Sequence, residues 1–328
     1  MNYIIFGGSG FIGTHLIHLL KKTKPKAKIY CLDIVMPGEE GVVPGVVERN
    51  EGVIYSRIDV RKPINYNINT TNDDIVFNLA AVHRTPGHED KEYFETNIRG
   101  AENVTSWCEE NGIKKILFTS SIAPYGASEE LKTEDTLPTP NTPYGISKLV
   151  AEKIHAAWKE KNNGQLVIVR PGIVYGKGEH GNMTRLYSGI HKHYFFYTRK
   201  DTIKACIYVK ELVSFFMWAL ENDKNGIWNC TFEPAYNIEQ ICEAMKSATG
   251  MDKNWIATLP GKLLLVIASV IGPIGGKALG IHPARVKKLM ISTNINGSKL
   301  KNSGYKFHYT LEESFKDWFD DCNGKYLK

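Results

Sequence analysis

The chain has 328 residues, of which 42% are hydrophobic and 23% are charged, values typical of a soluble globular protein. The net charge is +6, but the positive residues are scattered and form no run of five or six like charges. This pattern does not indicate a nucleic-acid-binding protein, although mild basicity would help to attract an anionic small molecule.

The six cysteines form no C-x-x-C pair and show no metal-ligand spacing, so we expect reduced, mostly buried thiols, a cytoplasmic protein and no metal site. The N-terminus lacks the features of a signal peptide. One apolar run, Leu263 to Ile271, is broken by Gly272-Pro273 and is too short to span a bilayer. We expect this run to form a buried or capping helix rather than a membrane-surface contact, and we expect no integral membrane segment.

The chain opens with a pattern of strand, glycine loop and helix. Residues 2–6 are apolar and rich in strand formers, and they lead directly into Gly7-Gly8-Ser9-Gly10-Phe11-Ile12-Gly13 and a helical pattern at 14–20. Gly7 allows a tight turn, Gly10 lets the backbone approach a pyrophosphate, and Gly13 lets the helix pack close to the strand. The N–H groups and positive dipole at the helix N-terminus would then favour phosphate binding.

The next predicted strand, Lys28 to Leu32, ends at Asp33, twenty residues after Gly13. An acidic side chain at this place accepts hydrogen bonds from a ribose 2′-hydroxyl and repels a 2′-phosphate. Asp33 therefore favours NAD over NADP.

Strand and helix patterns continue to alternate along the chain. We predict strands at residues 53–58, 75–79, 116–119 and 166–169, and helices at 92–110 and 144–161. Such alternation indicates an α/β fold with a doubly wound, Rossmann-like parallel sheet, whose ligand lies at the carboxyl ends of the strands.

The second half of the chain changes character after Arg170. Residues 172–200 have no clean period, and helical patterns return at 238–249 and from Leu311. We expect an NAD-binding domain at 1–171 with a return segment near 205–228, and a smaller C-terminal substrate-binding lobe made mainly of 172–328.

A candidate catalytic group lies at residues 142–148, a short way after Ser121. Tyr144 and Lys148 stand four residues apart and share one face if this segment opens a helix. A phenol titrates near pH ~10, and a neighbouring ammonium favours the phenolate, so the pair predicts a proton acceptor. Ser121 can hold the substrate oxygen meanwhile. This chemistry interconverts an alcohol and a carbonyl and requires a hydride carrier.

These motifs together resemble the extended short-chain dehydrogenases/reductases of the NAD-dependent epimerase/dehydratase superfamily, over nearly the whole chain. The residues that carry the resemblance are Gly7-Gly8-Ser9-Gly10-Phe11-Ile12-Gly13, Asp59-Val60, Asn78-Leu79-Ala80-Ala81, Asn97, Thr119-Ser120-Ser121, Tyr144 with Lys148, Arg170-Pro171 and Ile207-Tyr208-Val209-Lys210-Glu211-Leu212.

The resemblance implies NAD as cofactor and completes the set of predicted contacts. The predicted cofactor contacts are Gly7, Gly10, Phe11, Ile12, Gly13, Asp33, Asp59, Val60, Leu79, Ala80, Ala81, His83, Asn97, Thr119, Tyr144, Lys148, Pro171 and Ile173. The predicted substrate contacts are His83, Arg84, Ser121, Ile122, Tyr144, Arg185 and Lys204. In this resemblance Lys148 also holds the nicotinamide ribose.

Three departures from the family pattern bear on the reaction. Ile122 and Ala123 stand where dehydratases place an acidic pair, which disfavours dehydration. Ile173 stands where nucleotide-sugar epimerases usually have an Asn that meets the diphosphate, and their Arg-containing loop is not evident, so Arg185, Arg199 and Lys204 are candidate replacements. The loop at 172–176 and the apolar run at 263–271 also resemble the hydroxysteroid-dehydrogenase branch.

We therefore expect an NAD-dependent nucleotide-sugar 4-epimerase. The alternatives are a net reductase or dehydrogenase of a nucleotide sugar or of an apolar, 3β-hydroxysteroid-like alcohol, and a non-catalytic cofactor-sensing protein. The complete set of Ser121, Tyr144 and Lys148 argues against the last. The helices from Glu92 and Tyr144 resemble the family's dimer-forming pair, so we expect a homodimer with apolar contacts from Tyr93, Trp107 and Trp158.

Overall fold

A computed structural model describes residues 1–39, 50–83, 87–266, 269 and 290–328. Its main sheet has seven strands in the order β3-β2-β1-β4-β5-β6-β9, and every neighbouring pair is parallel. The strands are β1 (Asn2–Phe6), β2 (Lys28–Asp33), β3 (Val53–Arg57), β4 (Ile75–Asn78), β5 (Lys115–Thr119), β6 (Gln165–Pro171) and β9 (Gly226–Cys230). The prediction of a doubly wound α/β fold is confirmed.

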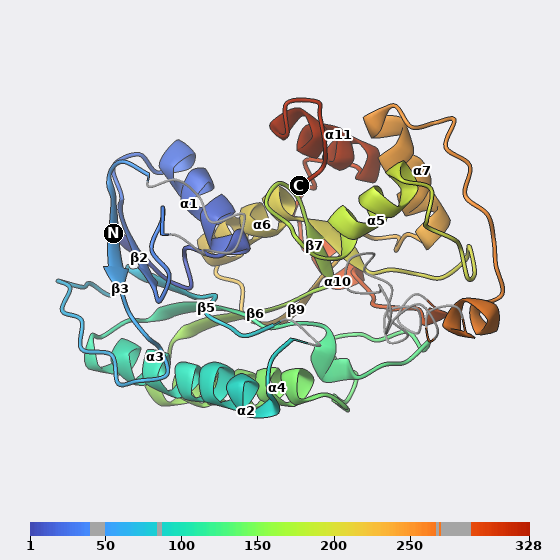
Figure 1. The fold of residues 1–328 in the computed structure, drawn as a ribbon. Helices are drawn as coiled ribbons and strands as arrows, with labels where there is room; N and C mark the ends of the chain where they lie inside the picture. The colour runs from blue at the N-terminus through green and yellow to red at the C-terminus, as the bar shows by residue number, and fades with distance from the viewer. Residues whose placement is uncertain (40–49, 84–86, 267–268, 270–289) are drawn as a thin grey trace.

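Helices cover both faces of this sheet (Figure 1). On one face lie α1 (Phe11–Thr23) and α6 (Val209–Glu221), and on the other lie α3 (Arg99–Glu110) and α4 (Pro143–Asn162). The strands are short apolar runs because both faces are covered. Strand order reverses between β1 and β4, so a crevice is expected at the carboxyl ends of these two strands.

The local sequence sets both ends of α4, the helix that carries Tyr144 and Lys148. The Oγ1 atom of Thr142 accepts a hydrogen bond from the Gly145 N–H (3.1 Å), and Pro143 occupies the first helical position. Asn163 ends the helix in the left-handed conformation, with φ 47°. The predicted helix at 144–161 is therefore one residue short at each end.

The predicted helix at 92–110 is instead three consecutive pieces. They are α2 (Asp90–Tyr93), a π-helical turn η1 (Phe94–Ile98) and α3. A π turn holds an extra residue, which rotates the following side chains relative to a continuous α-helix. Asn97 lies in this turn and is buried.

The C-terminal lobe is built from segments that lie far apart in the sequence. A two-stranded parallel sheet pairs β7 (Ile173–Tyr175) with β8 (Cys206–Tyr208). The helices of this lobe are α5 (Asn182–His191), α7 (Ile238–Thr249) and α11 (Leu311–Asp321), whereas η2 (Ala123–Tyr125) packs against α4 and α10 (Ser298–Lys301) against β9. The core of this lobe centres on Tyr175, whose ring stacks on Phe315 at 4.9 Å. Both β7 and α5 lie in the stretch where we saw no period.

One expectation about apolar residues is wrong, and another is wrong in part. Tyr93, Trp107 and Trp158 are only 2%, 2% and 4% exposed, because they face inward, so they cannot contact a second subunit. Leu263 and Val266 lie in a helical stretch at 261–266, as expected of a helix, but they are 47% and 61% exposed, so these two side chains are not buried. Ile271 lies outside the described residues. Within the described ranges, no helix is long and apolar enough to cross a membrane.

Candidate active site

The glycine loop connects β1 to α1 at the point where the strand order reverses. The Gly7 N–H donates to the Leu32 carbonyl (2.9 Å), and φ of Gly7 is +78°. A Cβ atom at Gly7 would lie 2.5 Å from the Ala80 nitrogen, and one at Gly13 would lie 2.6 Å from the Gly8 Cα. A Cβ atom at Gly10 would meet only the Gly7 oxygen, at 3.4 Å. The chain packs tightly at two glycines and leaves room at the third, which fits a pyrophosphate lying over Gly10.

Gly10, which has room for a Cβ atom, and Gly13, which has none, should respond differently to substitution by alanine. We expect Gly13→Ala to lower the free energy of unfolding by about 1–3 kcal/mol, because backbone atoms must move. We expect Gly10→Ala to keep the free energy of unfolding within about 0.5 kcal/mol of the wild type but to weaken NAD binding. Urea unfolding and NAD titration of both variants test this. Equal loss of stability in both variants would contradict the assignment.

Asp33 ends β2 beside the glycine loop, as the sequence predicts. One carboxylate oxygen accepts from the Ser9 N–H (2.9 Å) and the other from the Val35 N–H (3.1 Å). Desolvation raises the pKa of Asp33, and these backbone donors oppose the rise. The carboxylate is thus fixed next to the loop in a position suited to a ribose hydroxyl.

Asp33→Asn keeps the size of the side chain and removes its charge. We expect the ratio of the NADP to NAD dissociation constants to fall by about tenfold, because a 2′-phosphate is no longer repelled. Fluorescence titration of both cofactors measures the ratio. An unchanged ratio would remove Asp33 from the ribose site.

Other predicted cofactor contacts surround the same crevice. The Leu79 N–H extends the β4 pairing by donating to the Phe6 carbonyl (2.9 Å). Val60 is buried against Gly100, whereas the Asp59 carboxylate is held by Arg61 (2.8 Å). Phe11, Ile12, Leu79, Ala80 and Ala81 are partly buried, and His83 is exposed.

The Asn97 side chain is hydrogen-bonded to the backbone of the loop that follows β4. Its Oδ1 accepts from the Val82 N–H (3.0 Å), and its Nδ2 donates to the Val82 carbonyl (3.1 Å) and to the Ser147 hydroxyl (2.9 Å). The π turn brings this buried amide between the loop after β4 and helix α4. Asn97 therefore positions the loop that contains Ala80 and Ala81.

Ser121 and Tyr144 meet at the carboxyl edge of the sheet. Ser121 follows β5, Tyr144 lies in the first turn of α4, and their side chains are hydrogen-bonded. The Ser121 oxygen also accepts from the Ala123 N–H (3.1 Å), which opens the short 3-10 helix η2. The geometry thus joins two of the three predicted catalytic residues.

Lys148 lies one turn further along α4 and is 2% exposed. Its Nζ donates to the Thr119 carbonyl (2.9 Å) and lies 4.8 Å from the centre of the Phe118 ring. Burial lowers the pKa of Lys148 to about 7, and the Glu152 carboxylate opposes this shift. Near neutral pH this side chain can therefore exist in both protonation states.

We predicted that Lys148 lowers the pKa of Tyr144, but in the protein without cofactor the pKa of Tyr144 is raised. Desolvation raises the pKa of Tyr144 to about 12, and the main opposing effect is its hydrogen bond to Ser121. The Lys148 ammonium is engaged with Thr119, and its own charge is disfavoured by burial. Additional positive charge is therefore needed beside Tyr144 before it can accept a proton at neutral pH.

Glu152 continues the face of Tyr144 and Lys148 along α4 and was not predicted. It forms a buried pair with Arg170 of β6 through two hydrogen bonds (2.8 and 2.6 Å), and Ser120 donates to it (2.5 Å). The sequence signal was present, since 144, 148 and 152 repeat every four residues. The pair fixes β6 and the strand end before Ser121 against the catalytic helix.

The strand edge also carries unsatisfied polar groups. Among the described residues, the Thr119 Oγ1 and Asn78 Oδ1 atoms are buried without a hydrogen-bond partner. They end β5 and β4, next to Lys148 and to the loop that begins at Leu79. Together with the open Gly10 and the fixed Asp33, these acceptors fit a polar dinucleotide laid across the crevice.

The predicted substrate contacts are scattered around the lobe side. Ile122 packs with Tyr125 and Ala205. Of the remaining predicted cofactor contacts, Ile173 is a partly buried residue of β7, and Pro171 ends β6. Lys204 is buried and donates to the Ile291 carbonyl (2.6 Å), and desolvation lowers its pKa to about 8.

The other candidate phosphate ligands lie further out. Arg185 is exposed on α5 and donates to the His180 carbonyl (3.2 Å), and Arg199 pairs with Asp201 (3.1 Å). Arg84 lies outside the described residues. No substrate contact is thereby assigned by geometry.

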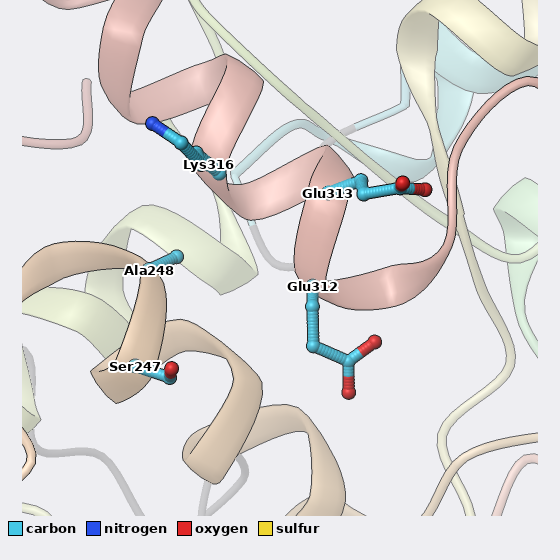
Figure 2. A pocket seen from close by; sticks show the side chains of 5 residues that line it. All are labelled: Ser247, Ala248, Glu312, Glu313 and Lys316. Atoms are coloured by element: carbon cyan, nitrogen blue, oxygen red, sulfur yellow. The ribbon is translucent and has the colours of Figure 1, made fainter.

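Two surface hollows lie away from these residues. One, of about 350 Å³, lies between α7 and α11, and Figure 2 shows its lining by Ser247, Ala248, Glu312, Glu313 and Lys316. The other, of about 430 Å³, lies beside α1, α6 and residues 304–308. Neither contains a predicted site residue, so we place the site at the strand edge, where the reactive side chains converge. The described ranges contain no group of three or more His, Cys, Asp or Glu side chains suited to a metal.

Known proteins match this chain over most of its length. The chain is 29% identical, over 95% of its length and 92% of the relative, to N-acetyl-alpha-D-glucosaminyl-diphospho-ditrans,octacis-undecaprenol 4-epimerase of Escherichia coli O157:H7. It is 24% identical, over 95% and 93%, to UDP-glucose 4-epimerase of Vibrio cholerae.

A solved structure, UDP-glucuronic acid 4-epimerase from Bacillus cereus in complex with NAD, superposes with a TM-score of 0.73 at 20% identity, covering 98% of this chain and 96% of that one. This likeness shows the shared fold. The model of the NAD dependent epimerase/dehydratase family matches residues 3–231. The chain therefore belongs to the NAD-dependent epimerase/dehydratase family.

Proposed function

We propose that this protein is an NAD-dependent 4-epimerase of a sugar carried on a diphosphate, with a nucleotide sugar as its first expected substrate. The observation that supports the proposal is the hydrogen bond between Ser121 and Tyr144 after β5, with Lys148 one helical turn further along α4 and bonded to the Thr119 carbonyl at the end of β5. The two relatives described above are both named 4-epimerases of diphosphate-linked sugars, one on UDP and one on a polyprenol.

The residues divide the chemistry between them. Bound NAD⁺ would take up the hydride from the sugar carbon and return it, and its positive charge would favour the Tyr144 phenolate. Tyr144 accepts the proton of the C4 hydroxyl, and Ser121 donates a hydrogen bond to the same oxygen as it becomes a carbonyl. Lys148 donates a hydrogen bond to the Thr119 carbonyl and would also hold the ribose of the cofactor. If the ketone intermediate rotates in the site before the hydride returns, the hydride would reach the opposite face of C4 and the configuration there would be inverted.

Two further features support epimerisation over related reactions. Ile122 and Ala123 carry no group that can move a proton, so elimination of water after oxidation is not supported. The complete set of proton-transfer residues argues against a non-catalytic, cofactor-sensing protein. A net dehydrogenase of a nucleotide sugar or apolar alcohol would use the same residues, and only the products separate the two.

The test is incubation of purified protein with UDP- and GDP-sugars and a catalytic amount of NAD⁺. NMR follows the sugar configuration while absorbance follows NADH. We expect interconversion of C4 epimers without accumulation of NADH. Stoichiometric NADH would instead indicate a dehydrogenase, and inactivity on every sugar diphosphate would favour the apolar-alcohol alternative.

We infer further that the enzyme is a cytoplasmic homodimer and that residues 172–328, apart from the return segment near 205–228, supply most of the substrate side. Six buried, free cysteines support a reducing compartment. Ile146 and Val150 are 39% and 37% exposed and lie one turn apart on α4, which offers an apolar stripe for a second α4.

Gel filtration tests the homodimer. We expect a dimer for the wild type and a shift toward monomer for Ile146→Glu/Val150→Glu, because two charges would be buried in the interface. A monomeric wild type at micromolar concentration would contradict the proposal.

A further inference from the structure

A segment with exposed apolar side chains belongs to the C-terminal lobe, and its backbone runs at the end of the molecule remote from β3 (Figure 1, orange). The exposed side chains of this segment are Trp255, Leu263 and Val266, which are 80%, 47% and 61% exposed. We call these three residues the docking surface. Leu263 and Val266 are three residues apart in the helical stretch 261–266 and therefore share a face.

The backbone under the docking surface is held in place. Ile256 is buried in the lobe core, so Trp255 beside it faces outward. Tyr197 exchanges hydrogen bonds with this segment: its N–H donates to the Ala257 carbonyl (2.9 Å), and its carbonyl accepts from the Leu259 N–H (2.9 Å). The large exposed ring of Trp255 is thus presented by an anchored chain.

The sequence that contains the docking surface is mainly basic, although one exposed acidic residue, Asp252, directly precedes Lys253. From Lys253 to Leu311 the sequence contains nine Lys and Arg residues and no Asp or Glu. Lys253 and Lys262, which flank Trp255 and Leu263, are both exposed. Apolar side chains with a tryptophan among basic residues match the interface of an anionic lipid bilayer. A second copy of the same surface would bring like charges together, which disfavours self-association there.

The docking surface is connected to the substrate side of the site by a short path. A Cβ atom at Gly261 would touch the Met290 side chain, so the two segments are adjacent. Three residues after Met290, Thr293 accepts a hydrogen bond from the Ala205 N–H. The Ala205 carbonyl in turn accepts from the Ile173 N–H (2.8 Å).

Ile173 is also the place where the expected nucleotide-sugar Asn is missing. The docking surface and position 173 therefore belong to the same part of the lobe.

We propose that the docking surface binds an anionic membrane and that the sugar diphosphate epimerised at the site is carried by a membrane lipid. This inference rests on the proposed 4-epimerase function and specifies its substrate class. The lipid tail would stay in the bilayer, and the sugar would reach Tyr144 through the lobe side.

The first test measures binding to lipid. The full-length protein is sedimented with vesicles of phosphatidylglycerol and phosphatidylcholine, and with vesicles of phosphatidylcholine alone. We expect binding to the anionic vesicles that weakens as salt is raised, and at least about tenfold weaker partition for Trp255→Ser/Val266→Ser. Ile54→Ser, at an equally apolar side chain 42% exposed on edge strand β3, is the matched control and should bind as the wild type does.

The second test separates this inference from the proposed function. UDP-sugar epimerisation in solution should be equal in the wild type and the double variant, because Trp255 and Val266 are outside the proposed reaction site. Conversion of a polyprenyl-diphosphate sugar in anionic vesicles should fall at least about tenfold in the double variant, in proportion to its lost partition. A wild type that stays in the supernatant, or a double variant that sediments with it, would overturn the docking proposal while leaving UDP-sugar activity unaffected. Inactivity on both substrates would overturn the proposed function itself.

Discussion

Tyr144→Phe is expected to lower kcat by about 10²–10⁴-fold, because the ring remains and only the proton-transferring hydroxyl is lost. NAD binding and the unfolding midpoint should stay close to those of the wild type, since the change removes one oxygen at a partly buried position. Steady-state epimerisation, NAD titration and urea unfolding of the same preparation check the three statements.

Tyr93→Phe is the matched control for Tyr144→Phe. The Tyr93 ring lies 6.1 Å from the Tyr144 ring, so the same substitution is made in the same surroundings. We expect Tyr93→Phe to retain kcat within about a factor of three, since this hydroxyl has no assigned role in proton transfer. Equal losses in both variants would show that packing of the two rings, rather than the Tyr144 hydroxyl, controls the rate.

Breaking the Glu152–Arg170 pair should have the largest effect on stability. Arg170 and Glu152 are 1% and 3% exposed at their side chains, so Arg170→Met leaves a buried carboxylate without its partner. We expect the free energy of unfolding to fall by about 3–5 kcal/mol. Urea unfolding measures this loss, and adding Glu152→Gln to the variant should restore part of it by removing the stranded charge.

Arg199→Met provides the comparison at the surface. Arg199 pairs with Asp201 at 3.1 Å, but its side chain is 49% exposed. Because water solvates both charges, the expected loss is within about 1 kcal/mol. If the unfolding midpoints of the Arg170 and Arg199 variants were the same, the buried pair would not be a main support of the site.

Most of the nucleotide-binding half could be predicted because its signals are local. The run at 2–6, the glycines at 7–13 and the Asp at 33 each report their own backbone conformation or chemistry. The parallel strands lie between helices, so they read as short apolar runs. Alternation of these runs with helical patterns was enough to predict the doubly wound sheet.

The lobe was harder because its order depends on distant partners. Strand β7 is three residues long and is stabilised by pairing with β8, some thirty residues later. Helix α5 has buried residues at 183, 186, 187 and 190, a helical spacing in a stretch of glycines, histidines and aromatics. The local signal existed at α5, but neighbouring residues obscured it.

The electrostatics of the site could not be read from spacing alone. The four-residue separation correctly placed Tyr144 and Lys148 on one helix, but it says nothing about desolvation. Burial lowers the pKa of Lys148 and raises that of Tyr144, so both shifts disfavour the lysine ammonium and tyrosine phenolate that the spacing alone predicts. Likewise, the sequence around Trp107 and Trp158 does not indicate whether these side chains pack against the sheet or against a second subunit.

The most direct test of the central claim follows the hydrogen on C4 of the sugar. A UDP-sugar carrying deuterium at C4 is incubated with the enzyme and catalytic NAD⁺, and NMR and mass spectrometry locate the label. We predict inverted product that retains deuterium at C4, with no accumulation of reduced cofactor, because the same hydride leaves and returns. Loss of the label to solvent, or its transfer to NADH that builds up with the ketone, would contradict the account.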